Sequence, residues 1–329
     1  DTSINSDEYF SQRQLKQGSV GWILLIGLGV AYVISGDFAG WNFGLAQGGW
    51  GGMFIATILV AIMYLCLCLS MSEMSTMMPT AGGGYSFARL AFGPFGGYLT
   101  GTAILIEYAI APAAIAVFIG AYCESLFGIN GWKIYLACYL IFMGIHLKGA
   151  GEALSIIFAI TSIAVLALIV FIAAMLPHFQ FSNLFNISTT SAAGANAFLP
   201  NGYIGIWAAV PFAIWFFLAV EGVPLAAEEA KEPQKSLPRG LIGAMLILTT
   251  FALLILILGV GAAGADTLKN SGAPLVDALI TVYGKDSWLA TFVNFVGLAG
   301  LIASFFSIIY AYSRQIFALS RAGYLPTSL

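Results

Sequence analysis

Three carboxylates stand inside long apolar runs of this sequence: Asp37, Glu107 and Glu221. A charged side chain at membrane depth is costly, and by default it marks a binding site or an ion pathway. An acid in this setting can bind an ammonium group or an inorganic cation, or it can carry a proton. The alternative for each is a structural role, in which a protonated or paired carboxyl holds two helices together.

Two of these acids lie where the chain cannot continue as a regular helix. Asp37 stands in "VISGDFAGWNFGLAQGG", residues 33–49, which is rich in glycine, and Glu221 stands in "LAVEGVPLAAEE", residues 218–229. Pro224 removes a backbone donor and opens the second helix. Open backbone at membrane depth is tolerated only inside protein or along a cavity. Two unrelated kinks are the alternative, but interruptions at matching positions of two halves point to a transporter's midplane site.

The elements that carry these acids are predicted to be transmembrane helices. The chain is 60% hydrophobic and only 8% charged, with a mean hydropathy of +0.93, whereas soluble domains carry about 25% charged residues. A helix needs roughly 20 apolar residues to cross a bilayer. Eight runs qualify, near residues 19–46, 50–72, 95–123, 132–147, 151–176, 203–229, 237–262 and 287–319.

The spacing of the two interruptions predicts the domain organisation. They fall in spans one and six, as a five-plus-five inverted repeat requires. We therefore expect a cytoplasmic tail at 1–18, a first repeat at 19–176, an outer loop at 177–201, and an incomplete second repeat at 202–329. With the N-terminus in the cytoplasm, nine Lys and Arg residues face inward and three face outward. This bias predicts a multi-pass protein of the cytoplasmic membrane.

Three longer motifs carry a resemblance to a known family. They are "SEMSTMMPTAGGGYSFARLAFGPFGGYLTG" at 72–101, "IWFFLAVEGVPLAAEEAKEPQKSLPRG" at 214–240 and "FALSRAGYLP" at 317–326. In this order they resemble the amino acid–polyamine–organocation (APC) superfamily of transporters. Within it, "SGDFAGWNFGLAQGGWGG" at 35–52 is most similar to the bacterial ethanolamine permeases.

The resemblance implies an all-α membrane fold with discontinuous first and sixth helices and ten core helices, usually followed by two more. With eight predicted helices, the sequence is expected to lack C-terminal helices of that fold. The resemblance further implies a secondary transporter that works by alternating access. It implies neither an enzyme nor a cofactor, and it leaves coupling by H⁺ or Na⁺ open.

The first interruption carries the substrate prediction. Amino-acid carriers of the superfamily place a Gly-x-Gly turn there, and its free amides bind the substrate carboxylate. This chain has Ser35, Gly36 and Asp37 instead. An ionised aspartate repels a carboxylate and attracts an ammonium, by about 4 kcal/mol at about 4 Å and a dielectric constant near 20. We therefore expect a small amine, ethanolamine above all. The alternative is an amino-acid permease in which Asp37 serves the coupling ion.

Aromatic rings close to the acids in sequence are the other candidates for substrate binding. An ammonium is attracted to an aromatic face by roughly 0.5–2 kcal/mol, although such rings are also ordinary packing in a chain with 14% aromatic residues. The candidates are Phe38, Trp41, Tyr108, Phe212, Trp215 and Phe216.

Coupling and gating are assigned to four further residues. Glu221 matches the glutamate of the family motif and is expected to carry a proton, with Glu107 as a second candidate. Glu73 and Arg89 are expected to pair as an inner gate, and Glu228 or Glu229 in the following cytoplasmic loop is an alternative gating group. Related proton-coupled carriers place a lysine inside span five, and this chain has none there.

Other functional classes find little support in the sequence. The two histidines, His146 and His178, stand near span ends and form no zinc-protease motif, and the cysteines lack metal-binding spacing. No basic stripe suggests nucleic acid. The expected partners are the amine substrate and the lipid bilayer, with a homodimer as a candidate assembly.

Overall fold

The computed structural model describes residues 20–80, 82–148 and 153–326, so the predicted tail 1–18 and the start of the predicted span 151–176 lie outside them. Within these ranges the chain is helical and forms no named strand. The elements in chain order are α2 (Trp22–Val33), α3 (Ser35–Phe38), α4 (Phe43–Met77), α5 (Gly83–Phe127), α6 (Trp132–Lys148), α7 (Ala153–Met175), η1 (Leu176–His178), η2 (Phe181–Phe185), α8 (Gly202–Ala213), η3 (Ile214–Phe216), η4 (Val220–Glu229), α9 (Pro233–Leu254), η5 (Ile255–Gly259), α10 (Val260–Ala263), α11 (Ala265–Leu268), α12 (Pro274–Tyr283) and α13 (Trp288–Arg321).

Six helical segments of the described chain are long and apolar enough to cross a membrane, against eight predicted. The predicted first span, 19–46, is divided into α2, α3 and the start of α4, and the described part of α6 is short. The six segments are Phe43–Met77, Gly83–Phe127, Ile156–His178, Gly202–Glu229, Pro233–Ala263 and Trp288–Arg321.

Two glycines with positive φ set the bends in α4 and α5. Gly49 (φ 65°) lies between the predicted first and second spans, and Gly93 (φ 75°) lies just before the predicted third span. Glycine adopts this left-handed conformation without the strain that a Cβ would bring. The backbone dihedrals at these two predicted boundaries are therefore not helical, and the chain kinks at both.

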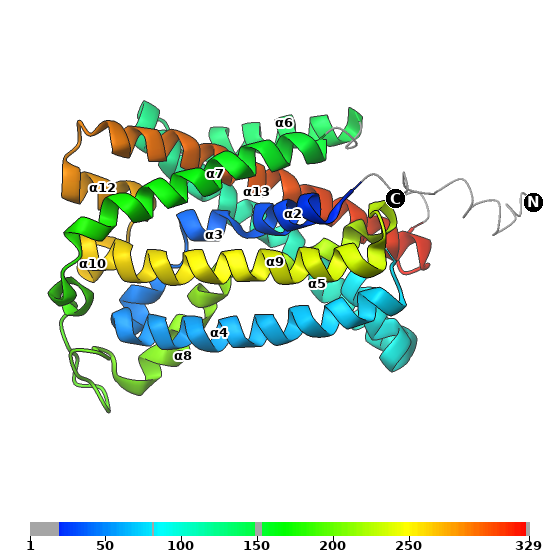
Figure 1. The fold of residues 1–329 in the computed structure, drawn as a ribbon, viewed down its shortest axis with the longest axis horizontal. Helices are drawn as coiled ribbons and strands as arrows, with labels where there is room; N and C mark the ends of the chain where they lie inside the picture. Colours follow the sequence, from blue (N-terminus) through cyan, green and yellow to red (C-terminus); the bar gives the residue numbers. More distant parts are fainter. Residues whose placement is uncertain (1–19, 81, 149–152, 327–329) are drawn as a thin grey trace, which may run out of the picture.

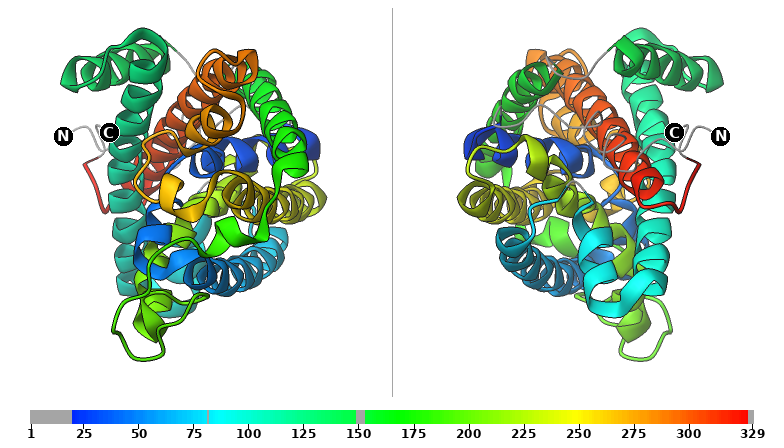
Figure 2. Two further views of the ribbon diagram at one scale, coloured as in Figure 1. Left: turned by 90° about the vertical axis from the view of Figure 1, so that its left-hand side faces the viewer. Right: turned by 90° about the vertical axis from the view of Figure 1, so that its right-hand side faces the viewer.

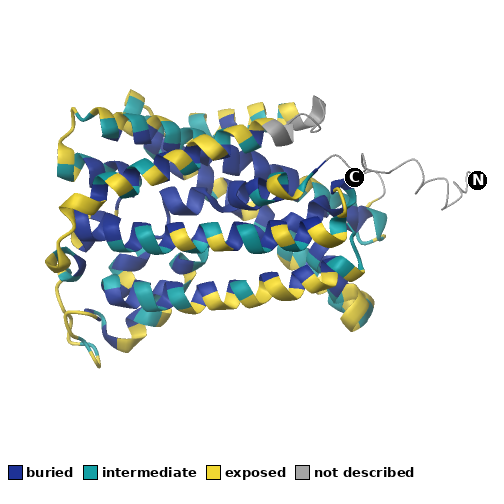
Figure 3. Cartoon of the chain, viewed as in Figure 1, coloured by how far each residue is buried: buried dark blue, intermediate teal, exposed yellow. Residues whose placement is uncertain are grey.

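The long helices lie side by side along the molecule, with α2 and α3 among them (Figure 1). α2 contacts α7, α9, α13 and η4, so the first interruption is enclosed by protein. α13 is the most buried span: 67% of its apolar window is buried, against 33–44% for the other five. Burial is concentrated in this interior, and the outer faces carry the exposed residues (Figure 3).

The start of α2 and the end of α13 lie at one end of the molecule, and the connection that follows η2 lies at the other (Figure 1). The end-on views show α6 standing outside the main body beside α5 (Figure 2). Two short helices between α10 and α13, namely α11 and α12, were not predicted, because each is too short to give a transmembrane signal.

Candidate functional site

The first predicted interruption is present, because the helix stops at Val33, resumes as the single turn α3, and ends again at Phe38. Ala39 is extended and Gly40 has a φ of 99°. A Cβ on Gly40 would lie 3.2 Å from Phe118 and 3.3 Å from Trp215. The chain therefore uses glycine here both for its conformation and for close packing.

The second predicted interruption is also present. α8 passes into the short 3₁₀ turn η3, Ala219 adopts a left-handed conformation (φ 75°), and η4 continues as a 3₁₀ helix through Pro224. The 3₁₀ form has poorer hydrogen-bond geometry than the α-helix and is rarely this long. A Cβ on Gly222 would lie 3.0 Å from the Tyr108 hydroxyl, so the backbone runs close against α5.

The two interruptions touch one another. A methyl group on Gly36 would overlap the backbone carbonyl of Trp215, so α3 packs on η3 at the backbone level. The Trp41 and Phe216 rings stack across the same contact, with centroids 5.5 Å apart. Spans one and six therefore meet where their helices are broken, as a shared site requires.

A small set of hydrogen bonds fixes the first interruption to its neighbours. The hydroxyls of Ser35 and Ser304 are 2.8 Å apart, and Ser304 also donates to the Tyr32 carbonyl. The Tyr122 hydroxyl donates to the Phe38 carbonyl over 3.0 Å. These bonds satisfy carbonyls that the broken helix leaves open. Ser304 and Tyr122 were not predicted, since their roles depend on contacts between distant spans.

Asp37 lies inside this bonded region. It is completely buried, and neither carboxylate oxygen has a hydrogen-bond partner in the described part of the structure. An unpaired buried carboxylate is strongly unfavourable unless it is neutralised or joined by a cation. The chemistry of the residue therefore fits a cation site, although both of its oxygens are inaccessible.

The predicted aromatic residues divide into two groups. Phe38, Trp41, Tyr108 and Phe216 are fully buried, and Trp215 packs edge-on against Phe118. Phe212 instead packs beside Phe43, near the start of α4. The first group surrounds the two interruptions, whereas Phe212 lies just before η3 and contacts the start of α4.

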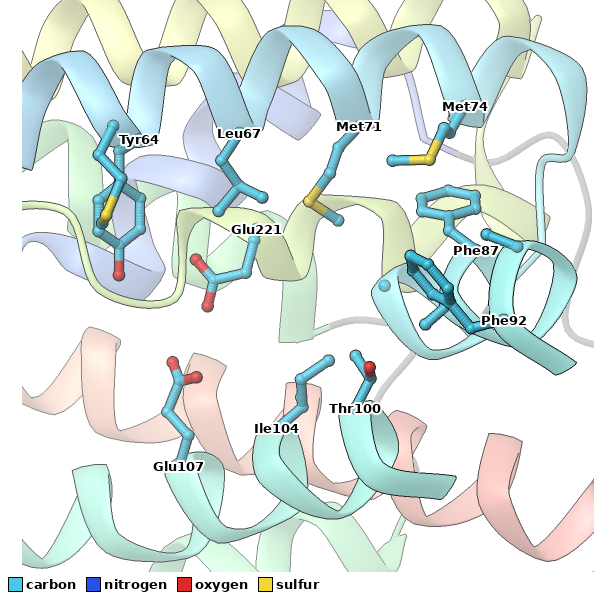
Figure 4. Close-up of a pocket in the computed structure, with 14 residues that line it drawn as sticks. Tyr64, Leu67, Met71, Met74, Phe87, Phe92, Thr100, Ile104, Glu107 and Glu221 are labelled. Atoms are coloured by element: carbon cyan, nitrogen blue, oxygen red, sulfur yellow. The ribbon is translucent and has the colours of Figure 1, made fainter. Parts of the chain in front are cut away.

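Glu107 and Glu221 lie together, apart from Asp37. Both line a cavity of about 430 Å³ between α4, α5 and η4 (Figure 4). The rest of the lining is mostly apolar, including Leu67, Met71 and Phe87. An apolar pocket with a few convergent polar groups has the character of a binding or relay site.

The end of η4 is bound to α13 by ion pairs. Arg314 pairs with Glu229, and Arg321 pairs with Glu228 at 2.7 Å. Backbone hydrogen bonds also join Val20 to this segment, from Val20 N to the Glu229 carbonyl at 3.0 Å and from Lys231 N to the Val20 carbonyl at 2.7 Å. The end of the predicted sixth span, 203–229, is therefore closed against the predicted first span, 19–46, and the predicted eighth span, 287–319.

The predicted pairing of Glu73 with Arg89 is not among the ion pairs of the described residues. Arg89 donates to the Tyr85 hydroxyl at 3.0 Å, and its guanidinium lies over the Tyr324 ring, so the arginine is already engaged. The arginines that do form ion pairs here are Arg314 and Arg321. Arg321 lies in the third family motif, 317–326, and Arg314 lies three residues before it, so this motif was the sequence signal that could have identified them. No group of three or more potential metal ligands occurs among the described residues.

Comparisons with known proteins agree with this architecture. The amino acid permease family model matches residues 20–329. An uncharacterized transporter of Rhizobium meliloti (strain 1021) is 30% identical over 307 residues, which cover 91% of this chain and 64% of that protein. The branched-chain amino acid permease BcaP of Lactococcus lactis subsp. cremoris is 29% identical over 84% of this chain and 63% of its own length.

A third relative is more distant. The D-serine/D-alanine/glycine transporter of Escherichia coli (strain K12) is 28% identical over 73% of this chain and 52% of its own length. The chain thus spans less than two thirds of the length of each of these three relatives. All three are transporters or permeases by name.

Proposed function

This chain belongs to the amino acid permease family, and we propose that the complete protein is a secondary transporter that carries a small amine across the cytoplasmic membrane by alternating access. The observation that carries the proposal is the fully buried, unpartnered carboxylate of Asp37, placed where the broken first and sixth spans meet. In this arrangement Asp37 binds the ammonium group. The N-terminus is cytoplasmic, residues 19–176 form one repeat, and residues 202–329 belong to the other.

Ethanolamine is the substrate that this chemistry favours. Asp37 stands on α3, in the turn where related amino-acid carriers bind the carboxylate of their substrate. A carboxylate-bearing substrate would bring two negative charges together in a site without water, whereas an amino alcohol brings only the positive one. The buried rings of Phe38, Trp41 and Phe216 supply apolar surface beside it.

An amino acid is the second candidate, and the names of the relatives favour it. BcaP is named for branched-chain amino acids, and another relative for D-serine, D-alanine and glycine. In that case Asp37 serves a coupling ion, and the substrate carboxylate binds elsewhere around the interruptions.

Coupling and gating are assigned to the sixth span. Glu221 carries a proton during the cycle, with Glu107 beside it, and Na⁺ is the alternative coupling ion. The ion pairs of Glu228 and Glu229 with α13 are the contacts that open on the cytoplasmic side.

Counterflow in proteoliposomes that contain the complete protein separates the two substrates. Labelled ethanolamine is supplied outside, and unlabelled ethanolamine, alanine or glutamate is loaded inside. Uptake driven by ethanolamine alone supports the amine site. Uptake driven equally by alanine would show that Asp37 does not exclude a carboxylate, and it would favour the amino-acid candidate.

A further inference from the structure

Two carboxyl groups from different spans face one another at one end of the cavity between α4, α5 and η4. Glu107 projects from α5 and Glu221 from η4, and their carboxyls point toward each other (Figure 4). One oxygen of each, Oε1 of Glu107 and Oε2 of Glu221, is inaccessible and has no hydrogen-bond partner in the described structure.

No basic side chain compensates this pair among the described residues. The cavity is lined by no lysine, arginine or histidine. The titratable groups that face the pair or the η4 backbone beside it carry no positive charge; they are Tyr64 and Cys68 on α4, Tyr108 on α5 and Tyr32 on α2. Two ionised carboxylates that face each other in a poorly solvated site repel each other strongly. A positive charge must therefore join them, and a proton requires the least space.

We propose that Glu107 and Glu221 hold one proton between them, which the transporter takes up and releases as one site. The protonated carboxyl shares its O–H with the other carboxylate. On release, the proton passes to water that enters the cavity, and two carboxylates remain, which repel one another. This inference rests on the proposed transport function and names the group that couples it.

The shared proton links a scaffold helix to a broken one. Glu107 stands on the long helix α5, whereas Glu221 lies two residues after Ala219, which adopts a left-handed conformation. With the proton bound, η4 is held against α5. Without it, repulsion favours their separation. Protonation therefore biases the position of the inner half of the sixth span.

Infrared titration of the purified complete protein in lipid tests the proposal without transport. The variants are Glu107→Gln, Glu221→Gln and the double variant, since glutamine keeps the size of the side chain and removes its proton. Glu124→Gln is the matched control, because Glu124 lies on the same helix and is exposed. The protonated-carboxyl band that the double variant removes is the band of the pair.

A shared proton predicts that either single variant lowers the midpoint pH of this band by roughly one to three pH units, since the remaining carboxyl loses its like-charged neighbour. The Glu124→Gln control leaves the midpoint unchanged. If either single variant leaves the midpoint unchanged, the two carboxyls titrate independently and the proposal is wrong. If either variant raises it, the neighbouring carboxyl was not repelling the remaining one, and the proposal is equally wrong. Because no substrate is present, this outcome is separate from a failure of the ethanolamine counterflow.

Discussion

The two interruptions differ in what surrounds their acids. At the first, Asp37 is sealed among buried groups, and Ser304 and Tyr122 fix the neighbouring backbone. At the second, Glu221 faces a cavity together with Glu107. A sealed carboxylate on a rigid turn is suited to selecting what binds. A carboxylate open to a cavity is suited to exchanging a proton with water. In the roles proposed above, the same local feature, a broken helix that carries an acid, serves two tasks.

The largest expected effect follows from the contact that both interruptions share. Gly36→Ala places a methyl group on the Trp215 carbonyl, and neither backbone can move without displacing its span. We expect transport to be lost and the free energy of unfolding to fall by roughly 1–3 kcal/mol. Counterflow and thermal unfolding in detergent measure the two effects.

Gly144→Ala is the control for this substitution. Gly144 lies in α6, and a methyl group added there would have no neighbouring atom within 4 Å, so alanine is expected to be neutral or slightly stabilising. Normal transport by Gly36→Ala would show that α3 and η3 are not packed as closely as described, and the comparison of the two interruptions would lose its common contact.

Asp37→Asn tests the selective role of the first interruption. Asparagine keeps the shape and removes the charge, so the Coulomb attraction for an ammonium is lost. Taking half of about 4 kcal/mol to allow for solvation, binding of ethanolamine should weaken roughly 30-fold. Equilibrium binding of labelled ethanolamine to the purified protein measures the change, with the exposed Asp286→Asn as control. Unchanged affinity would move the ammonium site away from Asp37.

The sequence was informative about the interruptions because glycine and proline act on their own backbone. Gly40 and Pro224 predict a break whatever packs around them, and both breaks are present. The contacts across spans are different. That Glu107 meets Glu221, and that Arg314 rather than Arg89 forms an ion pair with the end of η4, depends on how helices turn toward each other. Helical periodicity gives little information on which helix faces meet when the helices are apolar on most faces.

The end of η4 in the second interruption offers a graded test, because its two ion pairs differ in burial. Glu229 is 8% exposed and Arg314 18%, against 21% and 26% for Glu228 and Arg321. In double-mutant cycles with glutamine, we expect a coupling energy of roughly 1–3 kcal/mol for the buried pair and below about 1 kcal/mol for the other. Thermal unfolding of the single and double variants gives both values. Equal coupling energies would mean that burial does not determine which of the two ion pairs is stronger.

The smallest effect is expected just beyond that end, at the exposed pair of Glu232 and Lys235. The hydrogen bond from Lys235 lowers the pKa of Glu232 below its usual value. Any stability from this pair is therefore present above the ordinary glutamate pKa and is lost as the pH falls through the lowered one. Both side chains are about 70% exposed (69% and 71%), so water screens the attraction. Glu232→Gln should leave the unfolding temperature nearly unchanged at neutral pH and identical to wild type in acid. A large loss at neutral pH would show that this loop, and not only the two pairs on α13, holds the second interruption closed.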